Sequence, residues 1–318
     1  MMNISITNEC NRRCEFCFQK EWYLSNDKIQ KREMTLENIE KILEWAKNSK
    51  GRIKVFGGEP LLYSDLQGLF DVFKKFNRKI VFLTNFNVSS DKIDIVMNNI
   101  KNVAHMLINC DYNDSQKDQF DENISRLPKK ANISIGTTLL PDRKYVDKSI
   151  ERLLNTMKIL NRKKMKIRVA PMTPNFKIKF DNTYDHGDNI IYFMETILQQ
   201  FPKTIFGFDC YINRCEIGDD AMEQFKTKYK KKMEFRLECC YKHGPALDIL
   251  VDNSAVWCSS SKFIKVNNVF DYANPRELIN VLATKYNDYM QNNFWRTKCD
   301  ECIKFLNECD GLCASKIV

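Results

Sequence analysis

The chain has 318 residues, of which 43% are hydrophobic, and a formal net charge of +9. This length allows one large domain and a small one, and no apolar run reaches the roughly 18 residues that a membrane helix needs. The start of the chain lacks a basic region followed by an apolar core, and no basic stripe alternates with aromatic residues; we therefore expect a cytoplasmic protein with no membrane and no nucleic-acid partner.

Short apolar runs alternate with longer amphipathic segments along the first two thirds of the chain. The apolar runs predict strands over Met2–Thr7, Arg52–Phe56, Lys79–Thr84, Val103–Asn109, Asn132–Leu139 and Lys166–Ala170. The amphipathic segments predict helices over Leu36–Asn48, Asp65–Phe76, Asp91–Ile100, Gln116–Leu127, Val146–Leu160 and Ile190–Gln200. Such alternation predicts parallel βαβ units in an α/β fold, and six units indicate a partial (β/α)6 TIM-like barrel that is open on one side.

Three regions follow from this pattern. Residues 1–200 form the predicted barrel, residues 201–238 are mixed and charged and predict a connector, and residues 239–318 predict a small cysteine-rich domain. The chain holds 13 cysteines. Because disulfides are disfavoured in the cytosol, clustered cysteines there indicate metal binding or catalysis.

The first cysteine cluster follows the first predicted strand. It reads Cys10-Asn-Arg-Arg-Cys14-Glu-Phe-Cys17, a C-x3-C-x2-C spacing. A complete [4Fe–4S] cluster takes four cysteines, so three leave one iron with an open position, as a catalytic site requires. A zinc site with a distant fourth ligand is the alternative, but zinc ligands usually come as two separated pairs.

This triplet, with an aromatic residue before its last cysteine, resembles the signature of the radical S-adenosylmethionine (SAM) superfamily. The segment Phe56-Gly57-Gly58-Glu59-Pro60, about forty residues further on, resembles the GGEP segment of that family. The resemblance implies that the open iron binds SAM and that SAM is cleaved to a 5′-deoxyadenosyl radical, which abstracts hydrogen from a substrate carbon. It also implies that Phe16 lies against the adenine and that the Gly57–Pro60 segment binds the SAM ammonium.

Weaker matches end the later strands, where a barrel has its active-site rim. Asn109 and Asp111 end the fourth strand, Thr137 and Thr138 end the fifth, and Arg168 lies in the sixth. The resemblance implies that the hydroxyls of Thr137 and Thr138 reach the SAM ribose and that Arg168 pairs with the SAM carboxylate. It also places Asn109 among the residues that bind SAM. Thr84-Asn85 matches a Thr-Asn-Gly segment of relatives, but Phe86 takes the place of the glycine, so we expect a different local backbone.

The second cysteine cluster resembles the SPASM and twitch extensions of this superfamily. Cys240 and Cys258 flank a predicted hairpin with its turn at Asp252–Ser254, and the run C-x2-C-x6-C-x3-C follows, at Cys299, Cys302, Cys309 and Cys313. The resemblance implies one or two auxiliary [4Fe–4S] clusters, with Cys240, Cys258 and Cys313 on one and Cys299, Cys302 and Cys309 on the other. The x6 spacer is one residue longer than in SPASM domains and the last cysteine of that pattern is absent. A single cluster, a ligand from Cys239 and a structural zinc therefore stay open.

We accordingly expect a radical SAM oxidoreductase or maturase that modifies a peptide or protein side chain by oxidation or crosslinking. A flavodoxin- or ferredoxin-type protein would supply single electrons. A radical SAM dehydrogenase of a sugar or amino-acid derivative is the first alternative, and a zinc-stapled binding protein without catalysis is the second. No catalytic base is identified. Ser259 occupies the position where sulfatase-maturating relatives carry an aspartate, so we do not expect that activity.

Overall fold

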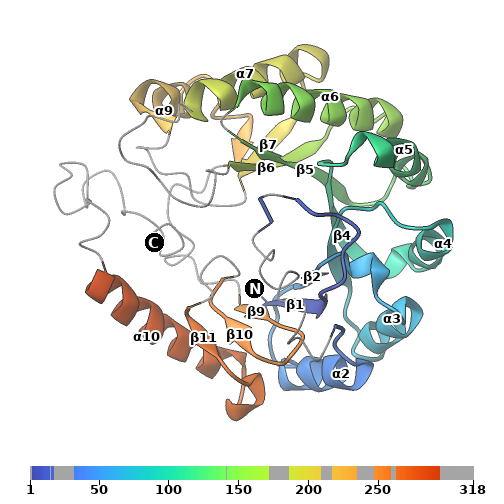
Figure 1. Cartoon of the computed structure of the whole chain (residues 1–318), viewed down its shortest axis with the longest axis vertical. Helices are drawn as coiled ribbons and strands as arrows, with labels where there is room; N and C mark the ends of the chain where they lie inside the picture. The colour runs from blue at the N-terminus through green and yellow to red at the C-terminus, as the bar shows by residue number, and fades with distance from the viewer. Residues whose placement is uncertain are drawn as a thin grey trace. The chain divides into compact units, whose positions relative to one another are not determined.

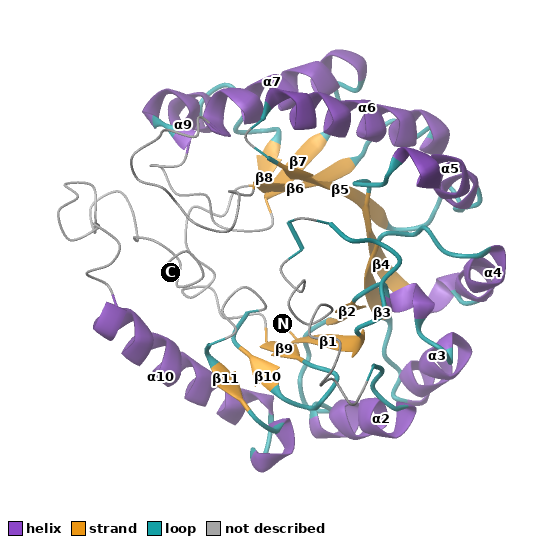
Figure 2. Cartoon of the chain, viewed as in Figure 1, coloured by secondary structure: helices purple, strands orange, loops and turns teal. Residues whose placement is uncertain are grey.

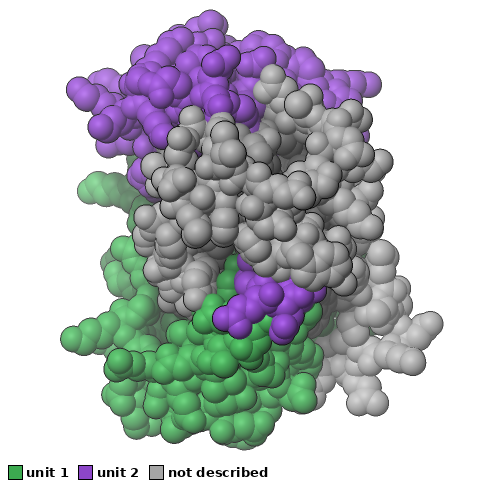
Figure 3. All heavy atoms as spheres, turned by 90° about the vertical axis from the view of Figure 1, so that its left-hand side faces the viewer, with its two compact units in different colours: residues 1–108, 126–132, 244–289 green, residues 109–125, 133–243, 290–318 purple. Residues whose placement is uncertain are grey.

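The computed structural model describes residues 2–14, 16–17, 32–140, 142–171, 186–208, 217–234, 247–258 and 263–293. The chain divides into two compact units, which Figure 3 colours separately. Unit 1 comprises Met1–Ile108, Arg126–Asn132 and Gly244–Tyr289, and unit 2 comprises Asn109–Ser125, Ile133–His243 and Met290–Val318. Each unit contributes strands and flanking helices, which are labelled in Figure 1.

The strands of unit 1 follow one another across the sheet in the order β11 (Lys265–Val266), β10 (Ala255–Val256), β9 (Leu247–Ile249), β1 (Met2–Thr7), β2 (Ile53–Gly57), β3 (Ile80–Thr84) and β4 (Val103–Asn109). β1 to β4 run parallel, with Met2 opposite Ile53 and Ile53 opposite Ile80. β9 also runs parallel to β1, whereas β10 runs antiparallel to both β9 and β11.

Amphipathic helices cover one face of the unit 1 strands, as Figure 2 shows for α2 (Leu36–Trp45), α3 (Leu66–Lys75) and α4 (Ser90–Asn98). α2 begins where the Thr35 side chain accepts the Asn38 N–H at 3.2 Å, which satisfies a backbone donor of its first turn. α3 buries its apolar stripe, which consists of Leu66, Leu69, Phe70 and Phe73. α10 (Pro275–Asn293) follows β11, and its Tyr286 ring stacks on Trp257 with 5.5 Å between centroids.

Unit 2 repeats the strand–helix alternation. Its strands run parallel in the order β5 (Ile133–Leu139), β6 (Lys166–Pro171), β7 (Ile205–Phe208) and β8 (Met233–Glu234). Its helices are α5 (Lys117–Ser125), α6 (Arg143–Leu160), α7 (His186–Gln200) and α9 (Asp219–Lys226). α6 starts at an Asp142 cap and ends at Asn161, which takes the left-handed conformation with φ 45°.

The six predicted strands and six predicted helices are confirmed, with shifts at their ends. The first helix stops at Trp45 rather than Asn48, and the last one begins at His186 rather than Ile190. The segment expected to be a connector carries β7, α9 and β8 in its described part and so continues the parallel alternation. The division of the chain into three regions stays a prediction. Within the described ranges, no helix combines the length and apolar character that a membrane crossing requires.

The predicted hairpin is also confirmed, and it lies in unit 1. Leu250 N–H donates to the Ser254 carbonyl at 2.8 Å, and Asn253 in the turn has a positive φ of 64°. Its first strand, β9, pairs with β1, and Asn3 Nδ2 donates to Asp248 Oδ1 at 2.5 Å across that pairing. A segment from late in the chain therefore extends the sheet beside the first strand, which the sequence pattern did not predict.

Candidate functional site

The three cysteines of the first cluster lie on the segment that leaves the carboxyl end of β1, residues 8–17, which we call the cluster loop. The chain returns to β1 at residues 32–34. There Asn8 N–H donates to the Arg32 carbonyl and Met34 N–H donates to the Ile6 carbonyl, both at 2.8 Å. The buried Tyr63 hydroxyl donates to the Met34 carbonyl at 2.5 Å. These bonds anchor the base of the cluster loop to the sheet.

The cluster cysteines are free of disulfides and half-buried. Cys17 N–H donates to the Cys14 carbonyl at 3.2 Å, which forms a turn between the last two of them. Burial raises the pKa of the Cys10 thiol to about 11, and coordination to a metal ion removes such a proton. Among the described residues, no three His, Cys, Asp or Glu side chains lie close enough together to coordinate one metal ion. Three thiols on one loop are nevertheless the donor chemistry that an iron–sulfur cluster takes.

Gly57 and Gly58 are needed because the cluster loop packs directly on them. A Cβ atom on Gly57 would lie 2.2 Å from the Thr7 carbonyl oxygen, and one on Gly58 would lie 1.9 Å from the Glu9 carbonyl oxygen. The backbones are joined there, since Gly58 N–H donates to Thr7 and Glu59 N–H donates to Glu9, both at 2.7 Å. The close approach expected of these glycines is thus made by the backbone of the cluster loop itself.

The Glu59 carboxylate is fully buried and links the loop after β2 to the end of β3. It accepts hydrogen bonds from the Leu61 N–H at 3.0 Å, the Thr84 hydroxyl at 2.5 Å and the Asn85 N–H at 2.6 Å. Burial raises the pKa of Glu59, while these hydrogen bonds and the Arg12 cation act in the opposite direction. Pro60, which follows, is buried and begins the short 3-10 helix Pro60–Leu62.

Phe86 follows Asn85 and has an unusual backbone. Its φ is 55°, in the left-handed region that favours glycine, and its side chain is fully buried. Phe86 N–H donates to the Thr84 hydroxyl at 2.8 Å. The phenylalanine thus takes a conformation that glycine adopts more readily, and whether the backbone here differs from that of relatives stays a prediction.

A second carboxylate, in unit 2, makes two contacts of the same kind. Asp111 follows β4 and accepts from the Thr137 hydroxyl at 2.5 Å and from the Thr138 N–H at 2.9 Å. Asn109 completes the group, because its side-chain amide donates to Asp111 Oδ2 at 3.0 Å. In both units a buried carboxylate after one strand thus binds a threonine hydroxyl and the next backbone N–H on the following strand.

The other predicted SAM contacts are placed as follows. Phe16 is half-buried on the cluster loop. Arg168 is half-buried in β6, opposite Gly207 of β7, and a Cβ atom on that glycine would lie 3.3 Å from Arg168 Cδ. Within unit 1 the structure therefore brings the cluster loop, Gly57–Pro60 and Thr84–Phe86 together, and within unit 2 it brings Asn109, Asp111 and Thr137 together.

Of the auxiliary-cluster cysteines, only Cys258 is among the described residues. It is half-buried and follows β10 in unit 1. The predicted ligands Cys240, Cys299, Cys302, Cys309 and Cys313 lie outside the described residues, as do Cys239 and Ser259. Their ligand sets stay predictions.

Two residues of the site were missed by the sequence analysis. Asn11 accepts from Asn85 Nδ2 at 2.8 Å and donates to the Asn87 carbonyl, while the buried Arg12 donates to the Asn85 carbonyl at 3.1 Å. Both lie in the spacer between Cys10 and Cys14, of which only the length entered the prediction of the cluster. Their place between two cluster ligands is the signal that could have identified them, although it does not tell which spacer residue is buried, since Arg13 in the same spacer is exposed.

Comparisons with known proteins show which family this chain resembles. The sequence model of the Radical SAM superfamily matches residues 4–172. A GTP 3',8-cyclase of Clostridium perfringens (strain SM101 / Type A) is 27% identical over 165 residues, which cover 49% of this chain and 46% of that protein. A probable GTP 3',8-cyclase of Methanocaldococcus jannaschii is 27% identical over 190 residues, covering 59% and 52% respectively. The chain thus spans about half the length of the curated relatives it matches.

Solved structures match over almost the whole chain. The crystal structure of Streptococcus suis SuiB bound to S-adenosylmethionine has a TM-score of 0.63 and 18% identity, covering 99% of this chain and 72% of that one. The structure of SuiB bound to precursor peptide SuiA has a TM-score of 0.62 and 17% identity, covering 99% and 71%. Structural similarity at such low sequence identity shows a shared fold. It confirms the predicted α/β class and partial barrel.

Proposed function

This chain belongs to the radical SAM superfamily, whose sequence model spans more than half of it, and we propose that Cys10, Cys14 and Cys17 hold a [4Fe–4S] cluster with one iron open to SAM. Together these groups supply a 5′-deoxyadenosyl radical by reductive cleavage of SAM, and that radical abstracts hydrogen from a substrate carbon. The observation that carries the proposal is the thiol triplet on a loop that packs on Gly57 and Gly58. Three thiols leave the open iron position that SAM requires.

The loop after β2 is proposed to bind the methionine part of SAM. The Glu59 carboxylate already accepts three hydrogen bonds from Leu61, Thr84 and Asn85. We therefore assign the SAM ammonium to backbone carbonyls of residues 57–60, with the Glu59 carboxylate holding that backbone in place. Phe16, from the cluster loop, is proposed to cover the adenine ring.

The unit 2 contacts are proposals of the same kind. Thr137 donates its hydroxyl proton to Asp111, which leaves the oxygen lone pairs able to accept from a ribose hydroxyl. The Asn109 amide is oriented by Asp111 for a similar contact. Arg168 is proposed to pair with the SAM carboxylate, because a guanidinium matches a carboxylate in geometry as well as charge.

For the substrate, we propose a peptide or protein side chain. The fold likeness to SuiB extends over 99% of this chain, and one of those SuiB structures contains a precursor peptide. Auxiliary [4Fe–4S] clusters on Cys240, Cys258 and the four later cysteines would accept an electron from the substrate, which makes the net reaction an oxidation or a crosslink. A flavodoxin- or ferredoxin-type donor is proposed to reduce the first cluster.

A small-molecule substrate is the second candidate. It is favoured by the curated relatives, which are GTP 3',8-cyclases, although these match about half of their own length. A zinc-stapled binding protein without catalysis is disfavoured, because the family match covers the thiol triplet.

The decisive experiment is anaerobic reconstitution of the full chain, followed by iron and sulfide analysis and an assay for 5′-deoxyadenosine. We expect iron, sulfide and SAM cleavage in the wild type, and no SAM cleavage in Cys14→Ala. Cys110→Ala is the matched control, because Cys110 is a buried cysteine outside the cluster loop. Zinc in place of iron, or a loaded protein that never cleaves SAM, would refute the assignment.

The substrate class is tested separately. The reconstituted enzyme is incubated with SAM, a reductant and either a short peptide encoded beside its gene or a set of nucleotides, sugars and amino acids. We expect mass spectrometry to detect loss of hydrogen from the peptide alone. Turnover of a small molecule with an unmodified peptide would favour the second candidate.

A further inference from the structure

Arg12 is a buried cation inside the spacer of the thiol triplet. The residue is only 5% exposed, and its guanidinium donates to the Asn85 carbonyl at 3.1 Å. Its backbone N–H points to Cys10 Sγ at 3.4 Å. Arginine is rarely buried to this extent, and this one stands beside the proposed ligands.

The charge of Arg12 interacts with a buried carboxyl group in this region. It lowers the pKa of the Glu59 carboxyl, although burial raises that pKa further. Along the chain Arg12 lies two residues from Cys10 and two from Cys14, inside the spacer between these proposed ligands. A buried cation thus stands between two proposed ligands and interacts with one fully buried carboxyl group, in a region where water screens little.

We propose that Arg12 is a positioning residue whose buried charge raises the reduction potential of the cluster held by Cys10, Cys14 and Cys17. The inference rests on the proposed function. Reduction adds one negative charge to the cluster, and a nearby buried cation stabilises that charge. Net charge, hydrogen bonds to sulfur and solvent exposure are the quantities by which a protein sets such a potential.

Arg13 is the matched control within the same loop. It is the same residue type, one position further on, but it is exposed. Its guanidinium donates to the carbonyls of Cys10 at 2.8 Å and Arg12 at 3.0 Å. Because its charge faces solvent and mobile ions, its effect on the cluster should be small.

The test is a redox titration of the reconstituted full chain, followed by electron paramagnetic resonance. The signal that changes when SAM is added identifies the cluster with the open iron. In Arg12→Gln we expect the ratio of reduced to oxidised cluster at a fixed potential to fall about tenfold, or about 59 mV for a one-electron couple. The reduction potential of Arg13→Gln should stay close to that of the wild type. The potential of Arg12→Lys should also lie near the wild-type value, because lysine keeps the positive charge.

Equal potentials in the wild type, Arg12→Gln and Arg13→Gln would overturn the role of Arg12 and leave the proposed function intact. A wild-type protein without a SAM-responsive cluster would instead defeat the proposed function. If Arg12→Gln loads no iron, Glu59→Gln decides. Removing that buried anion should raise the potential, and an unchanged value would show that buried charge here does not reach the cluster.

Discussion

Asn85 uses all of its polar groups to join three loops of unit 1. Its N–H donates to Glu59 at 2.6 Å, its side-chain amide donates to Asn11 at 2.8 Å and its side-chain oxygen accepts from the Asn87 N–H at 2.9 Å. Its carbonyl accepts from Arg12 at 3.1 Å. A buried amide with every group satisfied specifies one geometry, since losing any partner leaves a desolvated polar atom. This one residue thereby couples the cluster loop to the ends of β2 and β3.

Phe86, the next residue, is predicted to store backbone strain. At a φ of 55°, alanine is disfavoured relative to glycine, whereas at ordinary positions glycine is the less stable of the two. Both Phe86→Ala and Phe86→Gly should lose about 3–5 kcal/mol of buried packing. Phe86→Gly should nevertheless be more stable than Phe86→Ala by about 1 kcal/mol. Urea unfolding measures the difference, and alanine proving the more stable variant would contradict the strain.

Tyr63 is predicted to make the base of the cluster loop sensitive to high pH. Burial, with the nearby Glu33 and Asp65 charges, raises the pKa of Tyr63 to about 12. An unfolded tyrosine loses its proton near pH 10. The protonated Tyr63 therefore contributes fully to the free energy of unfolding below about pH 10, and this contribution declines as pH rises through about 12. Tyr63→Phe should abolish this part of the decline. It should also lower the free energy of unfolding by about 1–2 kcal/mol, because the Met34 carbonyl loses its donor.

Unfolding followed between pH 8 and 12 checks the prediction for Tyr63. Tyr145→Phe is the control, because Tyr145 is 47% exposed. Removing its hydroxyl should leave the pH profile of unfolding the same as in the wild type. Parallel pH profiles in Tyr63→Phe and the wild type would count against the assigned role.

At the scale of elements, the cluster loop and the loop after β2 pack backbone against backbone. A side chain at Gly58 would lie 1.9 Å from the Glu9 carbonyl oxygen, so one of the two loops would have to move. We expect Gly58→Ala to lose iron binding and to destabilise the protein by at least the roughly 1–3 kcal/mol typical of overpacking. Gly207→Ala is the control, since its Cβ would meet only flexible side-chain atoms of Arg168 and Lys166, at 3.3 Å.

Iron content after reconstitution and thermal unfolding distinguish these two variants. Full iron loading of Gly58→Ala would mean that the loops tolerate separation, and the close approach would then be unnecessary for the cluster.

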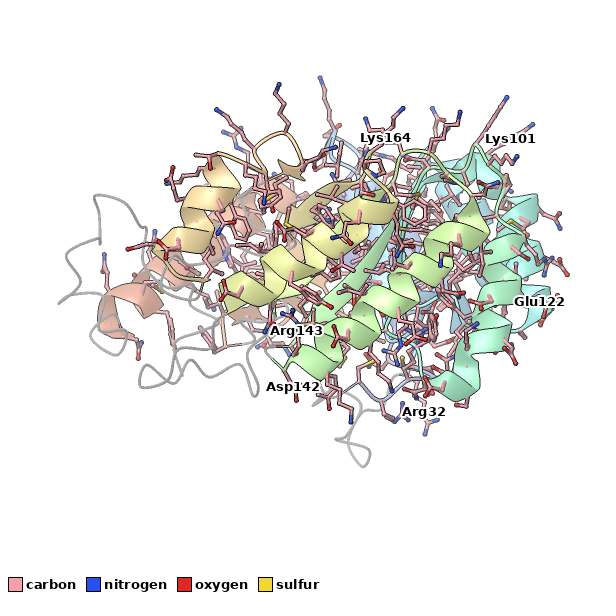
Figure 4. All side chains as sticks on the ribbon, turned by 90° about the horizontal axis from the view of Figure 1, so that it is seen from above. Arg32, Lys101, Glu122, Asp142, Arg143 and Lys164 are labelled. Atoms are coloured by element: carbon pink, nitrogen blue, oxygen red, sulfur yellow. The ribbon has the colours of Figure 1, made fainter. Side chains whose placement is uncertain are left out.

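At the scale of the whole molecule, the net charge of +9 is accompanied by segments that carry basic residues alone. In unit 1, residues 46–52, 76–79, 99–102 and 126–132, most of which lead into strands, contain lysine and arginine but no aspartate or glutamate. The same holds for residues 161–165, 201–204 and 227–232 of unit 2. Within unit 1, Figure 4 places Lys101 at the end opposite Arg32, and within unit 2 it places Lys164 at the end opposite Arg143. Lys101 and Lys164, which belong to these basic segments, therefore lie away from the proposed chemistry of their units.

This concentration of like charge predicts a salt dependence. Lys129→Glu combined with Lys130→Glu should raise the thermal midpoint at low ionic strength, because it relieves repulsion between exposed cations. The gain should vanish in about 1 M salt, where the screening length is about 3 Å. Lys41→Glu is the contrasting variant and should lower the midpoint, since Lys41 pairs with Glu37 at 2.7 Å. A gain that persists in high salt would exclude the electrostatic explanation.

Local periodicity accounts for the elements that could be predicted. The apolar run Ile80–Thr84 and the stripe on α3 depend on residues close in sequence, as does the Asn253 turn of the hairpin. The short strands β7 and β8 escaped prediction because four and two residues are too few to set a period. The pairing of β9 with β1 escaped it because it joins residues far apart in the chain.

The amino-acid order by itself determined the alternating strands and helices, the thiol triplet and the family to which the chain belongs, because each is carried by spacing within a short stretch. Only the tertiary structure decided that Gly57 and Gly58 lie beneath the cluster loop and that Glu59 and Asp111 each bind a threonine on the next strand. It also decided that Arg12 is buried while Arg13 is exposed. These facts depend on which loops meet at the carboxyl ends of parallel strands, and that meeting is a property of the folded chain.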